Sequence, residues 1–327
     1  MSGALGAIGF FGSPRIMAVG SSNTDMVVKM NRLPHPGETV LGGKFVTVAG
    51  GKGANQAVAA ARLGAQVTFV GKLGMDSFGD AALGNLEAEG ICCEFVARDP
   101  EEASGVALIL VDGTGENIIA VAPGANSRLA PEDVIRAADR LGECSALLLQ
   151  LEIPLDTVEC AARLARERRV SVILNPAPMC SEGLSARLLK LVDVLVPNES
   201  EARMLLGLGL DKAIDEEAGS DLLRMGVRRA VVTLGSKGAL VVTSDGVRRI
   251  PAPRVEAVDT TAAGDAFTGA LAVALSSGRD LLESAQTAAK AAALSVMRIG
   301  AQSSLPTVDE LARFRPVFRA WNASNAN

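Results

Sequence analysis

The segment ALLLQLEIPLDTVECAARLARERRVSVIL, residues 146–174, decides the fold class of this chain. It contains a short apolar strand over Ala146–Gln150, a helical pattern over Leu155–Arg168 and a second apolar strand over Val170–Leu174. A strand, a helix and a strand in this order form the repeating unit of a parallel sheet covered by helices. The segment therefore predicts an α/β fold.

The same alternation continues on both sides of this segment. Further strands are predicted over Ile16–Gly20, Val67–Gly71, Val194–Val196 and Ala230–Leu234, and further helices over Ala54–Leu63, Ser77–Glu89, Glu199–Leu206 and Asp215–Met225. From Gly264 onward the chain is nearly all helical in pattern. This alternation predicts a three-layer, Rossmann-like parallel sheet with helices on both faces. The 327 residues are expected to form one unit, because large α/β folds reach this size.

The domain boundaries follow from this alternation. We predict one α/β domain over residues 16–320, an N-terminal extension over residues 1–15 that is expected to be disordered, and a C-terminal tail over residues 321–327.

Two segments, Met26–Val48 and Gly105–Val121, break the alternation because no helix separates their strands. The second is the clearer hairpin, with GVALILV and IIAV on either side of the turn sequence DGTGEN. Strands outside a strand–helix–strand rhythm usually belong to another sheet. We therefore predict a small second sheet formed by about residues 24–50 and 103–123.

Composition narrows the class of ligand and the compartment. The net charge is -5, and no Lys or Arg cluster offers a surface for nucleic acid or an anionic membrane. The five cysteines form no CxxC pair and no zinc spacing, which favours a reducing cytoplasm. No stretch of about 18 uncharged apolar residues predicts a membrane span. The ligand is expected to be small.

The single histidine limits the chemistry. His35 lies between two prolines and is interpreted as a solvated loop residue, and the chain has no tyrosine. Histidine triads, HExxH zinc sites and tyrosine acid–base schemes are therefore excluded, leaving carboxylates, Lys, Ser, Thr and Cys as reactive groups.

The segment VDTTAAGDAF, residues 258–267, places a carboxylate at the start of a helix. Asp259, Thr260 and Thr261 are turn and N-cap types, so Asp265 falls in the first helical turn. The backbone N–H groups of residues 262–265 are predicted to be unpaired and to form an anion site that suits a phosphoryl group. The carboxylate either complements the helix dipole or accepts a proton, and this motif alone favours the dipole.

The segment AGGKGANQAVAAARLGA, residues 49–65, combines three glycines with the start of an Ala-rich helix. Gly50, Gly51 and Gly53 would let the backbone approach a small ligand with its N–H groups exposed, and Asn55 adds a donor and an acceptor. The spacing is not that of a P-loop. A glycine turn for close helix packing explains the segment equally well.

These two segments occur with six others in one order along the chain: GSSNTD (20–25), PHPGET (34–39), QLE (150–152), NPAP (175–178), PNESEA (197–202) and TLGSKG (233–238). Together, from about Ile16 to Pro306, they resemble the ribokinase-like family of sugar kinases. The resemblance implies ATP-dependent phosphorylation of D-ribose at O5, giving D-ribose 5-phosphate and ADP. It also implies Mg²⁺, an activating K⁺ ion, and a β-sheet lid over the sugar whose outer face joins a homodimer.

The resemblance assigns roles to particular residues. The general base would be Asp265, with an anion hole at Ala262, Ala263 and Gly264, where Ala263 replaces a glycine common in relatives. The sugar contacts would come from Asn23, Asp25, Gly51, Lys52, Gly53, Asn55, Glu152 and Asp265.

Nucleotide and metal contacts are likewise implied by the resemblance. ATP would contact Asn198, Thr233, Gly235, Ser236, Lys237, Gly238 and Gly264. Mg²⁺ would be held through water by Asn198 and Glu201. K⁺ would be bound, largely by backbone carbonyls, at Asp259, Thr261, Ser295, Arg298, Gly300 and Ser304.

Simpler interpretations of these residues stay open at this point. Asn23 and Asp25 are also ordinary turn formers, and Glu152 is also a solvated acid after a strand. Asn198 and Glu201 have the spacing of a helix N-cap with its reciprocal partner, and TLGSKG has the composition of an ordinary hairpin turn. Two alternative functions remain: a kinase of 2-deoxyribose, fructose or adenosine, and a catalytically silent sugar-binding protein.

Overall fold

The computed structural model describes residues 13–114, 116–179, 183–209 and 211–318. Its larger sheet has the strand order β13-β12-β11-β10-β9-β8-β1-β4-β5. These strands are β1 (Arg15–Val19), β4 (Gln66–Gly74), β5 (Cys92–Asp99), β8 (Ala146–Leu149), β9 (Ser171–Leu174), β10 (Val194–Leu195), β11 (Ala230–Thr233), β12 (Ala239–Thr243) and β13 (Gly246–Ile250).

The predicted α/β fold is confirmed, with one correction to the sheet. All strands from β11 across to β5 pair in parallel, whereas β12 and β13 are antiparallel at one edge. The turn at Gly235–Lys237 reverses the chain directly after β11, so no crossover helix can form there.

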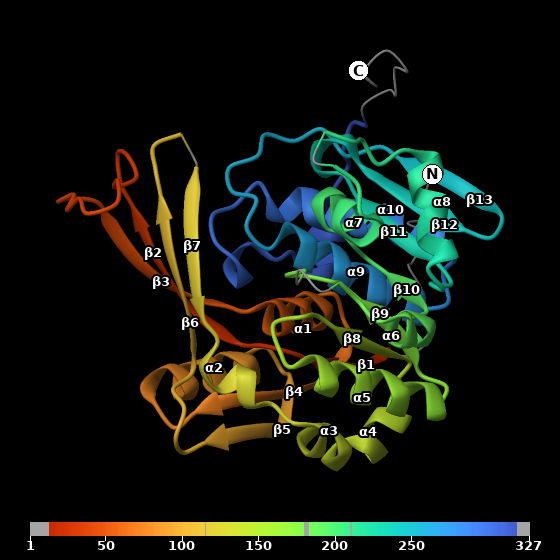
Figure 1. The fold of residues 1–327 in the computed structure, drawn as a ribbon, viewed down its shortest axis with the longest axis horizontal. Helices are drawn as coiled ribbons and strands as arrows, with labels where there is room; N and C mark the ends of the chain where they lie inside the picture. Colours follow the sequence, from red (N-terminus) through yellow and green to blue (C-terminus); the bar gives the residue numbers. More distant parts are fainter. Residues whose placement is uncertain (1–12, 115, 180–182, 210, 319–327) are drawn as a thin grey trace, which may run out of the picture.

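Helices cover both faces of this sheet, as Figure 1 shows. One face packs against α1 (Lys52–Arg62), α2 (Ser77–Ala88), α9 (Ala263–Ser276), α10 (Leu281–Ser295) and α11 (Val308–Arg313). The other packs against α3 (Pro131–Arg136), α4 (Ala138–Gly142), α5 (Leu155–Glu167), α6 (Ala186–Leu191), α7 (Glu199–Leu206) and α8 (Glu216–Arg224). Short turns of 3₁₀-helix lie at η1 (Gly124–Arg128), η2 (Gly235–Lys237) and η3 (Gln302–Ser304).

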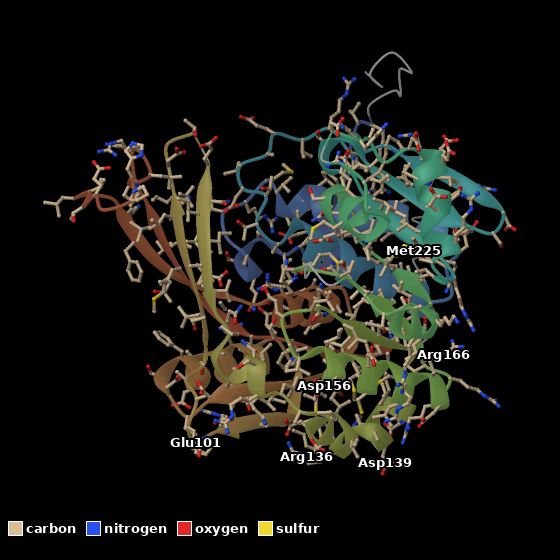
Figure 2. All side chains as sticks on the ribbon, viewed as in Figure 1. Glu101, Arg136, Asp139, Asp156, Arg166 and Met225 are labelled. Carbon is tan, nitrogen blue, oxygen red and sulfur yellow. The ribbon has the colours of Figure 1, made fainter. Side chains whose placement is uncertain are left out.

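Alternation along the buried strands divides the core in two. In β1, Met17 belongs to the layer under α3–α8, and Ile16 belongs to the layer under α1, α9 and α10. The outer sides of the helices are polar: Figure 2 shows the exposed side chains of Arg136, Asp139 and Asp156 on α3, α4 and α5. The centre of the sheet is thus buried on both faces, which is why strands such as β8, β10 and β11 are almost wholly apolar, whereas the edge strands β5 and β13 carry charged residues.

The predicted second sheet is present beside this body (Figure 1). Its strands have the order β3-β2-β6-β7, with β2 (Asn23–Lys29), β3 (Lys44–Gly50), β6 (Gly105–Val111) and β7 (Asn117–Ala122). Asp25 pairs with Val48 and Ala107, so these residues lie on one face. Neighbouring residues such as Met26 and Leu108 therefore lie on the opposite face.

Most predicted elements begin and end within two residues of the observed ones. α1 begins at Lys52 rather than at residue 54, so Lys52 and Gly53 belong to the helix. β5, the β12–β13 hairpin and the short helices α3, α4 and α6 were not predicted, because their apolar patterns are short or mixed with charged residues. The predicted extension, apart from residues 13–15, and the predicted tail lie outside the described residues, and β1 begins at Arg15. No helix in the described ranges combines the length and apolarity of a membrane span.

One close contact between two helices, α1 and α9, fixes their relative position beside the carboxyl edge of the sheet. A Cβ added at Gly269 of α9 would lie 2.6 Å from the Ala59 Cβ and 2.9 Å from the Gln56 carbonyl oxygen of α1. Real Cβ atoms do not approach other atoms this closely. The two helices therefore pack with their backbones nearly in contact, which holds the start of α9 beside the start of α1.

We predict that Gly269→Ala lowers the free energy of unfolding by about 1–3 kcal/mol, because the added methyl group overpacks the contact between α1 and α9. The measurement is urea unfolding followed by circular dichroism. Gly84→Ala in α2 is the matched control, since nothing lies within 4 Å of its added Cβ. That variant is expected to gain up to about 1 kcal/mol from helix propensity. Equal effects of the two variants would contradict the proposed contact.

Candidate active site

Polar side chains gather where the parallel strands end. Asn175 follows β9, Asn198 follows β10, and Gln150 and Glu152 follow β8. Because the strands are parallel, these ends meet at one edge of the sheet, which is where ligands of open α/β sheets bind.

A pocket lies at this edge and against the start of α9. Its lining combines the predicted residues Lys52, Asn198, Glu201, Thr233, Ala262, Gly264 and Asp265 with Asn175, Ala177, Val196 and Thr268. Residues more than 200 positions apart in the chain therefore face one cavity.

Asp265 is the buried carboxylate of this pocket. Its Oδ2 accepts a hydrogen bond from Asn55 Nδ2 at 3.0 Å, and its Oδ1 accepts one from Gln56 Nε2 at 3.0 Å. Burial raises the pKa of Asp265, and the charge of Lys52 and these two hydrogen bonds oppose that rise. A carboxylate with a raised pKa is suited to accept a proton near neutral pH.

The start of α9 differs in detail from the prediction. The N-cap is Ala262, with a left-handed φ of 59°, and not one of the polar residues Asp259, Thr260 or Thr261. The Asp259 carboxylate instead accepts hydrogen bonds from the N–H and hydroxyl of Thr261. This turn brings the chain into the helix without a side-chain cap.

The predicted anion site is correspondingly smaller. The Ala263 N–H donates to the Thr260 carbonyl at 3.3 Å, so it is not free. In the part of the chain that the structure describes, no hydrogen-bond acceptor faces the N–H groups of Ala262, Gly264 and Asp265. These three groups, at the positive end of the α9 dipole, are the donors available to an anion.

Lys52 lies among four carboxylates. Burial lowers its pKa, but the charges of Asp265, Glu152, Glu201 and Asp25 outweigh this effect and raise it. Lys52 is therefore charged at neutral pH. In the pocket this ammonium offsets part of the negative charge that the carboxylates would present to a phosphate.

Glu152 and Asp25 extend the carboxylate cluster toward the small sheet. The Glu152 Oε2 accepts hydrogen bonds from the Ser21 hydroxyl and from the Lys52 N–H. Burial, with the charges of Glu152 and Asp265, raises the pKa of Asp25 to about 7. Glu152 is half-buried, and its two hydrogen bonds tie the start of α1 to the loop after β8, which a merely solvated acid would not do.

Two amides complete this part of the site. Asn23 begins β2 and its Oδ1 accepts from Asn126 Nδ2 at 2.8 Å. Asn55 Oδ1 is buried and has no hydrogen-bond partner among the described residues. An unpaired buried acceptor beside a pocket points to a ligand that donates a hydrogen bond.

The glycines at the start of α1 serve close packing. Gly51 has φ 88°, and a Cβ there would lie 2.6 Å from the Asn23 nitrogen. A Cβ at Gly53 would lie 2.6 Å from the Ser21 nitrogen. The Lys52 and Gly53 N–H groups, expected to be exposed for a ligand, donate to Glu152 and to the Ser21 hydroxyl. The packing alternative therefore holds at both glycines.

Asn198 and Glu201 form the capping box that their spacing predicts. Asn198 Oδ1 accepts from the Glu201 N–H, and Glu201 Oε2 accepts from the Asn198 N–H, each at 2.8 Å. The described residues contain no cluster of three or more His, Cys, Asp or Glu side chains that could hold a metal ion. A site with Asn198 and Glu201 alone would suit an ion that keeps water and phosphate ligands, which is the habit of Mg²⁺.

The segment after β11 lies beside this capping box. Asn198 and Thr233 form a β-bridge, and the Thr233 N–H donates to the Pro197 carbonyl at 2.9 Å. The residues that follow, Gly235, Ser236 and Lys237, form η2, and Gly238 closes it with φ 99°. Of the six described residues Thr233–Gly238, only Thr233, the last residue of β11, lines the pocket.

The residues assigned to K⁺ occupy two adjacent loops. Asp259 Oδ2 accepts from the Gly300 N–H at 2.9 Å, which joins the loop before α9 to the loop after α10. The Ser295 carbonyl is occupied by the Arg298 N–H. Within the described ranges, no hydrogen-bond donor meets the remaining carbonyl oxygens of the set, those of Asp259, Thr261, Arg298, Gly300 and Ser304. Free carbonyl oxygens on two joined loops fit a monovalent cation.

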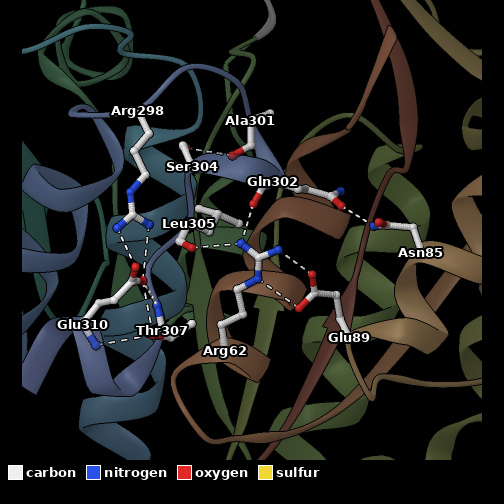
Figure 3. A network of polar contacts seen from close by, with 10 residues as sticks. All are labelled: Arg62, Asn85, Glu89, Arg298, Ala301, Gln302, Ser304, Leu305, Thr307 and Glu310. Atoms are coloured by element: carbon white, nitrogen blue, oxygen red, sulfur yellow. Dashed lines mark hydrogen bonds and ion pairs between the residues drawn. The ribbon is translucent and has the colours of Figure 1, made fainter.

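The second of these loops is held in place by a polar network (Figure 3). Arg62, at the end of α1, pairs with Glu89 and donates to the carbonyls of Gln302 at 2.7 Å and Leu305 at 2.9 Å. Arg298 pairs with Glu310 at 2.6 Å. The loop after α10 is therefore attached to the same helix that begins with Lys52.

Sequence reasoning missed the buried amides Gln56, Gln150 and Asn175, and also Ser21 and Asn126. Gln56 and Gln150 have no exposed surface, and both interrupt apolar runs of sequence. An uncharged polar residue inside an apolar strand or helix was the available signal, because such a residue must find partners.

Comparisons with known proteins agree with this geometry. The model of a family described as pfkB family carbohydrate kinase matches residues 13–308. The ribokinase of Haemophilus influenzae is 41% identical over 300 residues, covering 91% of this chain and 97% of that protein. The deoxyribokinase of Salmonella typhi is 40% identical over 296 residues, covering 90% and 96%. The structure of Arabidopsis thaliana ribokinase complexed with ribose and ATP superposes with a TM-score of 0.83 at 33% identity, covering 93% and 100%.

Proposed function

The chain belongs to the pfkB family of carbohydrate kinases, and we propose that it transfers the γ-phosphoryl group of ATP to O5 of D-ribose, giving D-ribose 5-phosphate and ADP. The family resemblance of the motifs is thereby confirmed. The observation that carries the proposal is the buried Asp265 carboxylate beside the three free N–H groups at the start of α9.

In the proposed mechanism Asp265 is the general base. The O5–H bond breaks and its proton passes to an Asp265 carboxylate oxygen, while O5 forms a bond to the γ-phosphorus. The bond between that phosphorus and the ADP oxygen breaks, and ADP leaves with the electron pair. The N–H groups of Ala262, Gly264 and Asp265 stabilise the negative charge on the transferring group, with Ala262 and Ala263 shaping the turn that exposes them.

The sugar is proposed to bind between the start of α1 and the small sheet. Asn23, Asp25, Asn55 and Glu152 supply amide and carboxylate groups that pair with hydroxyls, and Gly51–Gly53 keep the backbone close. A pocket built of such groups rejects analogues that lack the hydroxyls. Support comes from the unpaired Oδ1 of Asn55.

ATP is proposed to bind along Asn198, Thr233, Gly235–Gly238 and Gly264. Mg²⁺ would be held with the ATP phosphates by Asn198 and Glu201 through water, and it would neutralise phosphate charge. K⁺ would bind the carbonyls of Asp259, Thr261, Arg298, Gly300 and Ser304, whereas the carbonyl of Ser295, the sixth residue assigned to K⁺, already accepts from the Arg298 N–H. The support is the free carbonyl oxygens and the Asp259–Gly300 hydrogen bond that joins the two loops.

A second acceptor, 2-deoxyribose, is favoured by one observation. A relative named deoxyribokinase is 40% identical to this chain, close to the 41% of the ribokinase from Haemophilus influenzae. The two acceptors differ by one hydroxyl group. We propose ribose because Asn23, Asp25 and Glu152 form a site rich in hydrogen-bonding groups.

We also propose that the enzyme is a cytoplasmic homodimer joined through the outer face of the small sheet. The four cysteines of the described residues are free thiols, which suits a reducing compartment. The outer face carries Phe45, Leu108 and Ile118, which are 60%, 54% and 51% exposed. A contiguous exposed apolar face of a sheet is a usual site of association.

The function is tested by ADP release from ATP and Mg²⁺ over D-ribose, 2-deoxyribose, fructose and adenosine, each with K⁺ and with Na⁺. Turnover is expected on D-ribose and is expected to rise with K⁺. Faster turnover on another acceptor would keep the mechanism and overturn the assignment of the substrate. A protein that turns over none of the four but binds ribose would be the silent sugar-binding protein.

Replacing the proposed base gives the sharpest test of the mechanism. Asp265→Asn is expected to lower kcat by roughly 10² to 10⁴, because no group then accepts the O5 proton. Ribose binding, measured by calorimetry, is expected to persist, since the substituted amide keeps the size of the side chain. Turnover near that of the wild type would remove Asp265 from the base role.

The proposed dimer is tested by Leu108→Asp, which places a charge on the outer face of the small sheet. Sedimentation velocity is expected to show dimers for the wild type and monomers for the variant, because an unpaired charge cannot be buried at an apolar contact without large cost. Ile135→Asp on α3 is the control, since Ile135 is 50% exposed but distant from the small sheet. Dissociation by both variants, or by neither, would contradict this interface.

A further inference from the structure

A buried chain of side-chain amides lies behind Asp265. Gln150 Nε2 donates to Gln56 Oε1 at 2.6 Å, and Gln56 Nε2 donates to Asp265 Oδ1 at 3.0 Å. Gln56 Nε2 also donates to Asn175 Oδ1 at 3.2 Å. Gln56 and Gln150 have no exposed surface, so water cannot replace these contacts.

The charge of Asp265 fixes the direction of every hydrogen bond in this row of buried side-chain amides. An ionised carboxylate only accepts, so the amino group of Gln56 must face Asp265 and its carbonyl must face Gln150. Gln150 must then turn its own amino group toward Gln56. At the other branch, Asn175 Nδ2 donates to the Val196 carbonyl at 2.8 Å, which leaves Asn175 Oδ1 to accept from Gln56.

Burying the Gln150 side chain costs folding free energy, because one of its polar atoms has no partner in the described part of the chain. Its Oε1 is buried and has no hydrogen-bond partner among the described residues. Gly20 leaves room for it, since a Cβ at Gly20 would lie 2.1 Å from that oxygen. A leucine would suit the apolar end of β8, so apolar packing alone does not explain a glutamine here. What a leucine could not do is donate to the buried Gln56 Oε1.

We propose that Gln56 and Gln150 are positioning residues for the transfer: Gln150 holds the Gln56 amide, and Gln56 orients the Asp265 carboxylate and keeps it ionised until the acceptor hydroxyl gives up its proton. This inference rests on the proposed function. With Asn55 on Oδ2 and Gln56 on Oδ1, each oxygen has one donor from α1. The remaining lone pairs then point in fixed directions toward the pocket.

The direct test is the titration of Asp265 itself, which does not depend on turnover. Carboxyl-carbon NMR of the wild type and Gln56→Met is compared, with the Asp265 signal assigned by its loss in Asp265→Asn. Hydrogen bonds to the ionised form lower a pKa, so removing the Gln56 donor is expected to raise that of Asp265 by about one to two pH units. An unchanged titration would overturn the inference.

The kinetic test uses the pH profile of kcat/KM on the acceptor that the wild type phosphorylates. Gln56→Met is expected to move the acidic limb to higher pH and to lower kcat at neutral pH by about 10- to 100-fold, with KM for the acceptor nearly unchanged. Gln150→Leu is expected to move the limb in the same direction by less. A change in KM alone would assign these residues to substrate binding instead.

Stability separates positioning from a structural role. Gln150→Leu removes the unpaired Gln150 Oε1 but leaves the buried Gln56 Oε1 without its donor, so the midpoint of urea unfolding is expected to stay nearly unchanged while the pH profile still moves. Asn85→Leu is the control: it breaks the amide hydrogen bond from Asn85 Nδ2 to Gln302 Oε1, visible in Figure 3, at a site away from Asp265. That variant is expected to lower stability without moving the pH profile. A Gln150→Leu variant that loses stability and keeps the wild-type profile would make the amide chain purely structural.

Discussion

The close approach of α1 and α9 is the constraint on which the site depends. Gly269 allows the two backbones to meet, and this contact brings Asn55 and Gln56, on the first turn and a half of α1, onto the carboxylate of Asp265. Any larger residue at the contact would separate the two helices. A packing requirement about one helical turn behind Asp265 thereby sets the geometry of the proposed base.

Electrostatic balance is the second requirement at this edge. Asp25, Glu152, Glu201 and Asp265 all influence Lys52. Burial disfavours the charged forms of Lys52, Asp25, Glu201 and Asp265. Burial and like charge raise the pKa of Asp25 to about 7, so a further negative charge beside this cluster would be unfavourable. An acceptor rich in hydroxyl groups, which donate hydrogen bonds to carboxylates, is compatible with such a cluster, whereas a phosphate is better placed at the N–H groups of α9.

The parts of the fold that were predictable have strong local signals. Strands such as β8 and helices such as α5 are recognised by apolar runs and by helical spacing, and Asp265 was expected in a first helical turn. Local patterns do not encode contacts across the chain. The left-handed Ala262 and the pairing of Gln56 with Gln150 arise from tertiary packing, and glutamine in an apolar strand has no fixed local meaning.

The two faces of the small sheet have different proposed roles, one in the sugar site and the other in the dimer contact. Side chains alternate along β2, so Asp25 faces the proposed sugar site while Met26 lies on the opposite face with Leu108. A slip of β2 by one residue against β3 and β6 would exchange these faces, placing Asp25 among apolar side chains and Met26 beside the carboxylates. The register that places Phe45, Leu108 and Ile118 on the face of the proposed dimer contact is therefore the same register that places Asp25 on the face of the proposed sugar site. For this reason, the proposed interface supports the sugar site without contributing a residue to it.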